Sequence, residues 1–275
     1  MAEVNIEPFF LESPRGPLFC LFLSPSPPVL KGSVLYLHPF AEEMHKSRRM
    51  AALQARALAA HGYAVLQIDL TGCGDSAGDF AEASWSAWLE DARLAHAWLY
   101  QKTAQPVSLW GLRTGALLAA HLAQQLHAIH RLLLWQPVTD GSLFLTQFLR
   151  IKLASEMLSD GQSKSGTKAL RARLAAGEWV EVGGNKLSTE MAREIEGVKL
   201  ATMVPSCAVV WLEVGAATGA HLTPASQRVA DIWRDAGTEI QAHTVMGDPF
   251  WATQEITECS GLIEITLASL AALAP

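Results

Sequence analysis

The chain has 275 residues, enough for one large α/β domain or for somewhat under two average domains. Half of the residues are hydrophobic and 17% are charged, so the chain can bury a sizeable core and is not disordered. The net charge is −6 and no lysine- or arginine-rich block stands out, which gives no indication of nucleic-acid binding.

The sequence shows neither a membrane span nor a signal peptide. No apolar run approaches the roughly 18 residues that a spanning helix needs, and no basic segment followed by an apolar stretch opens the chain. The four cysteines, Cys20, Cys73, Cys207 and Cys259, are scattered and fit no metal-ligand spacing. We therefore expect a cytoplasmic protein with free thiols, no metal and no other cofactor. The sequence carries no signal of oligomeric state.

Apolar runs alternate with amphipathic stretches over the first half of the chain. Strands are expected at 17–23, 33–38, 63–70, 106–110 and 131–135, and helices at 46–61, 84–101 and 114–127. This alternation predicts an α/β fold with a mostly parallel twisted sheet and helices on both faces.

The alternation stops near residue 140. Residues 140–205 have a helical pattern with polar and glycine-rich interruptions, which we interpret as an inserted helical cap. Strands are expected again at 207–213 and 239–245, and helices at 224–236 and 251–272. The predicted core therefore comprises residues 1–139 and 206–275.

Ligands of open parallel sheets bind outside the carboxyl ends of the strands. The segments that follow the expected strands are 38–44, 69–79, 111–115, 136–140, 213–223 and 246–251. Functional side chains are expected in these six segments.

Three of these segments resemble motifs of the α/β-hydrolase fold. Residues 111–115 (GLRTG) are similar to the nucleophile elbow G-x-S-x-G. His38-Pro39-Phe40 resembles the turn that lends an oxyanion N–H, and residues 69–76 resemble a D-x-x-G-x-G-x-S loop. The resemblance covers nearly the whole chain and implies an α/β-hydrolase fold, with oxyanion-like N–H groups at Phe40 and Thr114.

A narrower resemblance is carried by HPFAEEMHKSRRM, IDLTGCGDSAGDF, WGLRTGALLA and GDPFW. These segments are similar to the hydrolase family associated with the exosortase A system, second type. The resemblance implies a role alongside bacterial exopolysaccharide production and the sorting of surface proteins. A hydrolase fold does not by itself establish hydrolysis.

The catalytic triad expected of this fold is replaced. Arg113 stands at the nucleophile position, and a guanidinium cannot attack an acyl carbon. No carboxylate follows Glu213 in VGAATGAHLTP, and no histidine occurs in MGDPFWATQ after the last strand. Three departures argue against Ser-His-Asp hydrolysis.

Arg113 has two interpretations. At the start of helix 114–127 it could bind an anionic ligand, because helix N–H groups and a guanidinium both favour carboxylate or phosphate. Thr114, Phe40, His221 and Trp251 would then border the ligand. Alternatively, Arg113 forms an internal ion pair with Glu213 or Asp248, since a buried arginine needs a partner.

Other candidates for chemistry lie nearby. Glu43, His38 and His45 could support general acid–base catalysis through a water molecule, although no nucleophile is evident. Cys73 could be a nucleophile beside His38, but an inert small residue in a glycine-rich loop is the favoured interpretation.

Three functions therefore compete. The chain could be a hydrolase of an ester or thioester bond that acts without the usual triad. It could be a non-catalytic protein that binds an anionic acyl, lipid-linked or sugar ligand at Arg113. It could also be a protein–protein module, in which case we expect an exposed apolar patch on the cap.

Overall fold

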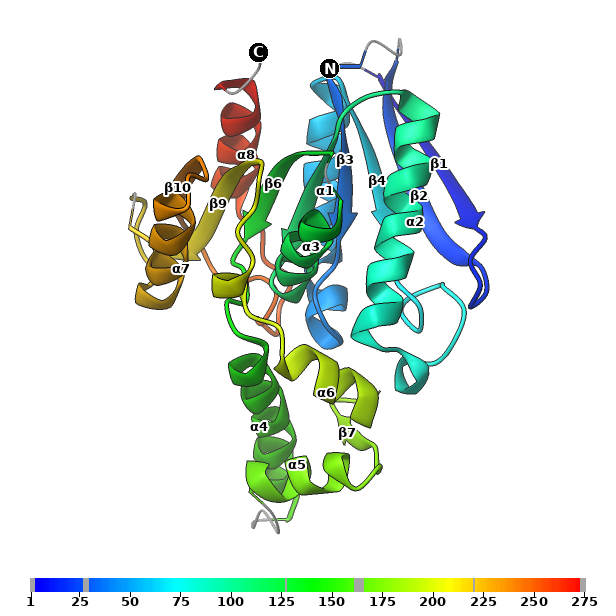
Figure 1. Cartoon of the computed structure of the whole chain (residues 1–275), viewed down its shortest axis with the longest axis vertical. Helices are drawn as coiled ribbons and strands as arrows, with labels where there is room; N and C mark the ends of the chain where they lie inside the picture. Colours follow the sequence, from blue (N-terminus) through cyan, green and yellow to red (C-terminus); the bar gives the residue numbers. More distant parts are fainter. Residues whose placement is uncertain (1–2, 27–29, 127, 161–165, 220, 273–275) are drawn as a thin grey trace.

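The computed structural model describes residues 3–26, 30–126, 128–160, 166–219 and 221–272. Its centre is an eight-stranded sheet with the order β1-β2-β4-β3-β5-β6-β9-β10 (Figure 1). The strands are β1 (Glu3–Leu11), β2 (Leu18–Ser26), β3 (Gly32–Leu37), β4 (Tyr63–Ile68), β5 (Val107–Leu112), β6 (Ile129–Trp135), β9 (Ala208–Gly215) and β10 (Ile240–Met246). Pairing is antiparallel from β1 to β4 and parallel from β4 to β10.

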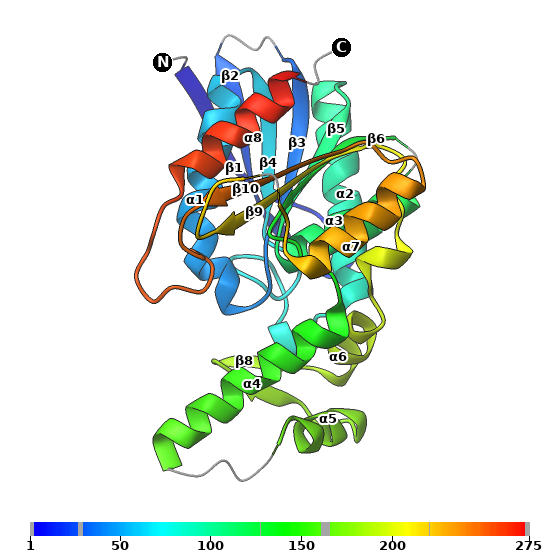
Figure 2. The ribbon, with the colours of Figure 1, turned by 90° about the vertical axis from the view of Figure 1, so that its left-hand side faces the viewer.

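Helices cover both faces of the sheet. They are α1 (Glu42–Ala60), α2 (Trp85–Thr103), α3 (Thr114–Gln125), α7 (Pro224–Asp235) and α8 (Ser260–Ala272). Helices α1 and α8 cover one face, and α2, α3 and α7 cover the other (Figures 1 and 2). Strand β3 shows why both faces need cover: Val34 and Tyr36 belong to one apolar cluster, and Leu35 and Leu37 to the other. The predicted α/β-hydrolase fold class is confirmed.

The segment between β6 and β9 forms a separate layer beyond the carboxyl ends of the strands (Figure 1). It contains α4 (Gly141–Asp160), α5 (Thr167–Ala175), β7 (Val180–Val182), β8 (Asn185–Leu187) and α6 (Thr189–Glu196). The hairpin β7–β8 differs from the helical prediction. Gly183 and Gly184 form its two-residue turn with φ of 55° and 81°, values that suit a hairpin and that glycine adopts without strain.

An aromatic cluster joins this cap to the core. The ring of Phe40, after β3, lies 5.5 Å from that of Phe144 and 5.1 Å from that of Phe148, both on α4. On the core side, Phe40 contacts Phe80 at 5.1 Å and Trp88 at 5.4 Å. Phe40 is 2% exposed, so it anchors the cap over the end of β3.

One strand was not predicted, and the predicted starts of two helices were wrong. Strand β1 was not predicted; it is an edge strand with Pro8 in its middle, and its Phe10 is 55% exposed. Helix α1 begins four residues before the predicted start, with Glu42 and Glu43 in its first turn. The last helix begins at Ser260 rather than at 251, because residues 251–259 form a loop that places Trp251 in the core.

Within the described residues, no helix is long and apolar enough to cross a membrane.

We predict that Phe40→Ala lowers the free energy of unfolding by about 3–5 kcal/mol, because it removes a buried ring from the contact between core and cap. Denaturant unfolding of the purified protein measures this change. Phe10→Ala is the matched control, since an exposed ring should contribute about 0.5 kcal/mol or less. Equal losses for the two variants would contradict the assigned role of Phe40.

Candidate functional site

Arg113 occupies a strained turn between β5 and α3. Its φ of 57° and ψ of −116° are rare for a residue with a side chain. The flanking glycines make the turn possible: a Cβ on Gly111 would lie 2.3 Å from the carbonyl oxygen of Gly115, and one on Gly115 would lie 2.1 Å from that of Leu37. The backbone therefore has the form of a nucleophile elbow, with arginine at its apex.

Similar strain occurs at the ends of the two neighbouring strands. Ala41, after β3, has a φ of 51°, and Gln136, after β6, has a φ of 43°. Strands β3, β5 and β6 are adjacent in the sheet. Strained non-glycine residues cluster at functional sites, so this edge is the strongest candidate in the described part of the chain.

The Arg113 side chain forms a largely buried ion pair with Glu43. Its Nε lies 3.3 Å from Oε1 of Glu43, and the two side chains are 18% and 16% exposed. Its guanidinium carbon also lies 5.6 Å from the ring of Trp251. The partner is therefore Glu43, and not Glu213 or Asp248 as predicted.

Glu43 has an unusual environment. Burial raises the pKa of this carboxyl, and the nearby Arg113 opposes that rise only in part. Its second oxygen, Oε2, is buried and has no hydrogen-bond partner within the described residues. One oxygen of Glu43 thus binds Arg113 while the other is available for a proton or a donor.

Three other residues predicted at the site, Glu213, Asp248 and His221, have environments of their own. Glu213 accepts hydrogen bonds from the backbone N–H of Thr223 at 2.7 Å and from its hydroxyl at 3.3 Å, which stabilises the start of α7. Asp248 is exposed. His221 is exposed as well, and its carbonyl oxygen accepts from the Thr244 hydroxyl. Within the described residues, no ion pair or hydrogen bond joins Arg113 to Asp248 or to His221.

A cavity of about 230 Å³ opens beside Arg113. It lies between the end of β6, the start of α4 and the start of α7, with Gln136, Glu213 and Thr223 among its lining residues. The Gln136 side-chain oxygen accepts from the backbone N–H of Val214 at 2.8 Å, which ties β6 to β9. Sequence reasoning did not single out Gln136, although it lies in the segment after β6 where functional residues were expected.

His38 has a structural environment. It is 4% exposed; its Nε2 accepts from the backbone N–H of Leu70 at 3.2 Å, and its Nδ1 lies 2.8 Å from the carbonyl oxygen of Pro39. Burial lowers the pKa of His38, which keeps the ring neutral. His45 points to solvent from α1. Glu43 and the two histidines therefore do not form a single acid–base group.

The glycine-rich loop after β4 holds its own shape. Asp69 accepts from Arg48 at 2.9 Å and from the backbone N–H of Asp75 at 3.1 Å. Cys73 is buried, and burial raises the pKa of its thiol, so the nucleophilic thiolate is disfavoured. These contacts support the interpretation of Cys73 as an inert loop residue.

Thr114, directly after Arg113, is 1% exposed, and its hydroxyl has no hydrogen-bond partner within the described residues. Searching those residues also finds no group of three or more histidine, cysteine, aspartate or glutamate side chains placed to hold a metal ion.

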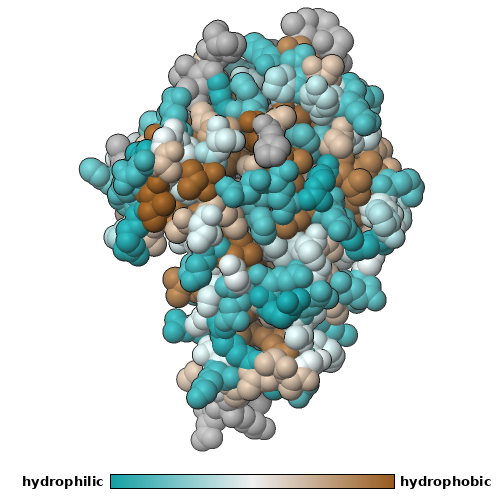
Figure 3. Space-filling view, viewed as in Figure 1, coloured by the Kyte–Doolittle hydropathy of each residue, from teal (hydrophilic) through white to brown (hydrophobic). Residues whose placement is uncertain are grey.

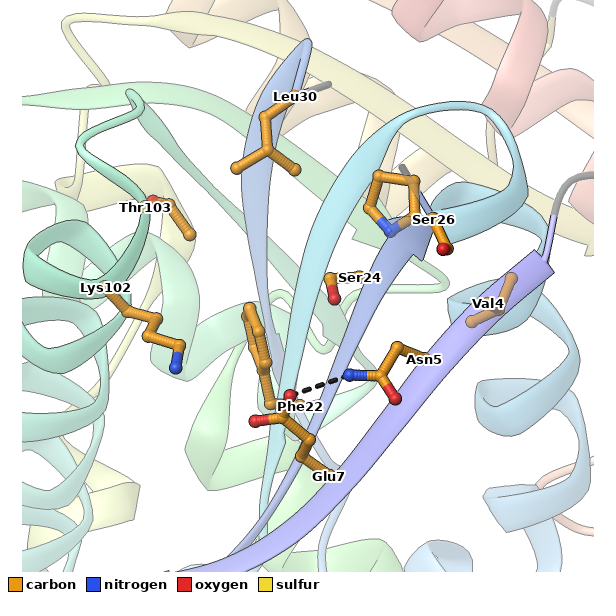
Figure 4. Close-up of a pocket in the computed structure, with 10 residues that line it drawn as sticks. Val4, Asn5, Glu7, Phe22, Ser24, Ser26, Leu30, Lys102 and Thr103 are labelled. Atoms are coloured by element: carbon orange, nitrogen blue, oxygen red, sulfur yellow. Dashed lines mark hydrogen bonds between the residues drawn. The ribbon is translucent and has the colours of Figure 1, made fainter. Parts of the chain in front are cut away.

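A larger cavity, of about 470 Å³, lies away from the strand ends that bear Arg113 (Figure 4). It is bounded by β1, β2 and the end of α2, and Lys102 lies over the ring of Phe22 at 5.7 Å. Asn5 donates to Glu7 at its rim. These contacts join residues of the cavity wall to one another, and they do not place reactive side chains of the described residues side by side.

The cap carries exposed apolar side chains. Leu143, Met157 and Leu158 on α4 are 61%, 59% and 89% exposed, and Trp179 is 52% exposed. Figure 3 shows apolar patches on core and cap within a mostly hydrophilic face. These cap residues are the surface that a protein–protein function would use.

The sheet order, the elbow and the cap define an α/β-hydrolase. The family model for serine aminopeptidase, S33, matches residues 29–221, more than half of the chain. The chain therefore belongs to the serine aminopeptidase S33 family.

Solved structures agree on the fold. Est1E from Butyrivibrio proteoclasticus with bound ferulic acid superposes with a TM-score of 0.69 at 17% identity, covering 96% of this chain and 99% of that one. A thermostable carboxyl esterase from Bacillus coagulans gives 0.65 at 14% identity and covers both chains fully. The thioesterase domain from the curacin biosynthetic pathway gives 0.56 at 17% identity, covering 96% and 99%. A search of curated protein sequences finds no match.

We predict a pH dependence that is specific to Glu43. Because its pKa is raised in the folded state, protonation favours folding, so the Glu43 contribution to stability rises as pH falls through the folded pKa. Unfolding free energies of the native protein and Glu43→Gln, measured from pH 7 to pH 4, should show this gain only in the native protein. A native protein that loses stability relative to the variant over this range would contradict the assignment.

Proposed function

We propose that this chain is a divergent hydrolase-family protein that recognises an anionic acyl, lipid-linked or sugar ligand through Arg113. The observation that carries the proposal is the position of Arg113: it stands at the apex of the elbow and lines the adjacent cavity. At that place an active serine hydrolase carries its nucleophile. Ser-His-Asp hydrolysis is not part of the proposal.

The guanidinium retains capacity for a ligand. Within the described residues, its only carboxylate partner is Glu43, through Nε. The two terminal nitrogens are the ones that form bidentate contacts with carboxylate or phosphate. The start of α3 adds the positive end of a helix dipole at the same point.

Hydrolysis of an ester or thioester by another route is the second candidate. It is favoured by Glu43, whose raised pKa and unpartnered Oε2 suit proton transfer to or from a water molecule. In this scheme Arg113 would hold the anionic part of the substrate, and Glu43 would act on the water. The backbone N–H groups of Phe40 and Thr114 would stabilise the oxyanion.

We further propose that the protein acts in the bacterial exopolysaccharide and exosortase system, in the cytoplasm. The four segments that resemble the second type of exosortase-associated hydrolase support the first part. The four cysteines are free thiols, which supports a reducing compartment. The exposed apolar side chains of α4 and Trp179 offer a surface for a protein of that system.

Arg113→Met is expected to abolish stabilisation by anionic ligands. Decanoate, dodecyl phosphate and galacturonate are suitable probes, each at ionic strength matched with sodium chloride. A ligand at about 100 times its Kd should raise the unfolding free energy of the native protein by about 2.7 kcal/mol. Thermal unfolding measures the effect.

Two further variants keep this test interpretable. Arg56→Met removes an exposed arginine of α1 and should leave ligand stabilisation intact. The double variant Arg113→Met with Glu43→Gln removes both charges of the pair, so it avoids a buried unpaired carboxylate. If the anionic ligands stabilised both Arg113 variants as much as they stabilise the native protein, the proposal would be wrong.

Incubation with a fluorophosphonate should leave the intact mass unchanged, because no activated serine stands at the elbow. Mass spectrometry of the purified protein measures this directly. A stoichiometric adduct, mapped to one hydroxyl, would show that a serine-type nucleophile exists elsewhere.

A further inference from the structure

A third cavity, of about 240 Å³, lies at the opposite end of the sheet from Arg113 and the cap. It is formed where parallel strands begin: Lys31 precedes β3, Tyr63 and Ser108 lie at the starts of β4 and β5, and His130 and Arg131 lie at the start of β6. In Figure 1 this is the end of the sheet near the last turn of α8. The mechanism proposed above uses none of these residues.

The side chains that line this cavity include cations but no anions. Lys31 and Arg131 carry positive charges among its lining residues, His130 adds a neutral imidazole, and none of the lining residues is aspartate or glutamate. Arg131 is 7% exposed, and no carboxylate of the described residues lies within ion-pair distance of it. Its Nη1 donates to the carbonyl oxygen of Leu270, near the end of α8, at 3.2 Å. A neutral carbonyl compensates only part of a buried charge.

The charges around Arg131 also show that its positive charge is not fully compensated. Burial lowers the pKa of Arg131, and the negative charge of Glu239 opposes this only in part. Arg131 in turn contributes to lowering the pKa of His130, after burial. The cavity is therefore a region of positive potential without a matching anion from the described chain.

Lys31 is held at the mouth of this cavity. Its backbone N–H donates to the carbonyl oxygen of Gly62 at 2.8 Å, and a Cβ built on Gly62 would lie 3.3 Å from Cγ of Lys31. The aliphatic stem of Lys31 therefore packs against the backbone of Gly62, and Lys31 is one of the residues that line the cavity.

We propose that this cavity binds a phosphate group, either as free phosphate or as part of a phosphomonoester. Arg131 provides a planar fork and Lys31 a mobile point charge. The Tyr63 and Ser108 hydroxyls, which form no hydrogen bond within the described residues, add further donors. Donors that converge from four strands match the three terminal oxygens of a phosphate group better than the two of a carboxylate.

The test separates this site from the one at Arg113. Calorimetric titrations with inorganic phosphate and with glucose 1-phosphate are carried out on protein that carries both Arg113→Met and Glu43→Gln, at ionic strength fixed with sodium chloride. Lys31→Met in that background alters an exposed residue and should fold normally. Arg131→Lys keeps the buried charge but removes the fork. Lys168→Met, an exposed lysine of α5, is the matched control.

We expect saturable binding in this double-variant background, a Kd at least about tenfold weaker when Lys31→Met or Arg131→Lys is added, and no change when Lys168→Met is added. Tighter binding of glucose 1-phosphate than of inorganic phosphate would assign a phosphomonoester, and the reverse order would assign free phosphate. Absence of saturable binding for both anions would overturn the proposal. Equal Kd values in the Lys31, Arg131 and Lys168 variants would do the same.

Discussion

The backbone of α3 approaches β3 so closely at Gly115 that a single added carbon would meet the carbonyl oxygen of Leu37 at 2.1 Å. This contact fixes where α3 begins, and the residue between β5 and α3 has a positive φ. The apex residue is thereby raised above the ends of the parallel strands. Whatever side chain stands there must face the cavity, the first turn of α1 and the loop after β10.

In this chain that side chain is a cation, and the surrounding residues are arranged around its charge. Glu43 approaches from α1 and Trp251 from the loop before α8. A partly buried pair of this kind adds little net stability compared with an apolar replacement, because desolvation offsets the attraction. A buried ion pair at this position is therefore better explained by a function of the Arg113 charge, such as binding an anion in the adjoining cavity, than by stability.

The fold could be predicted largely from the sequence, and the details of the site only in part. Strands such as β3 are apolar on both faces, which indicates a parallel sheet between two layers of helices, and the glycines at 111 and 115 indicate the elbow. Strand β1 escaped prediction because half-exposed edge residues and Pro8 obscure its pattern.

Long-range pairings were harder to predict. Glu43 lies 70 residues from Arg113, and the two meet only because β3 and β5 are neighbours in the sheet. Local periodicity does not reveal the order of parallel strands in the sheet. The carboxylates near the expected strand ends, Glu213 and Asp248, were therefore predicted as ion-pair partners of Arg113, and this prediction was wrong. The positive cavity at the start of β6 was missed for the same reason, since its members come from four separate strands.

The aromatic contact at Phe40 has a thermodynamic consequence. Phe40 touches α4 through Phe144 and Phe148, and the same short segment continues through the strained Ala41 to Glu43. A tilt of the cap would therefore displace the backbone that carries the partner of Arg113. The position of the cap and the geometry of the Arg113–Glu43 ion pair are therefore coupled. A ligand that stabilises one geometry of the ion pair also stabilises the corresponding cap position, and by reciprocity the ligand binds more tightly when the cap is in that position.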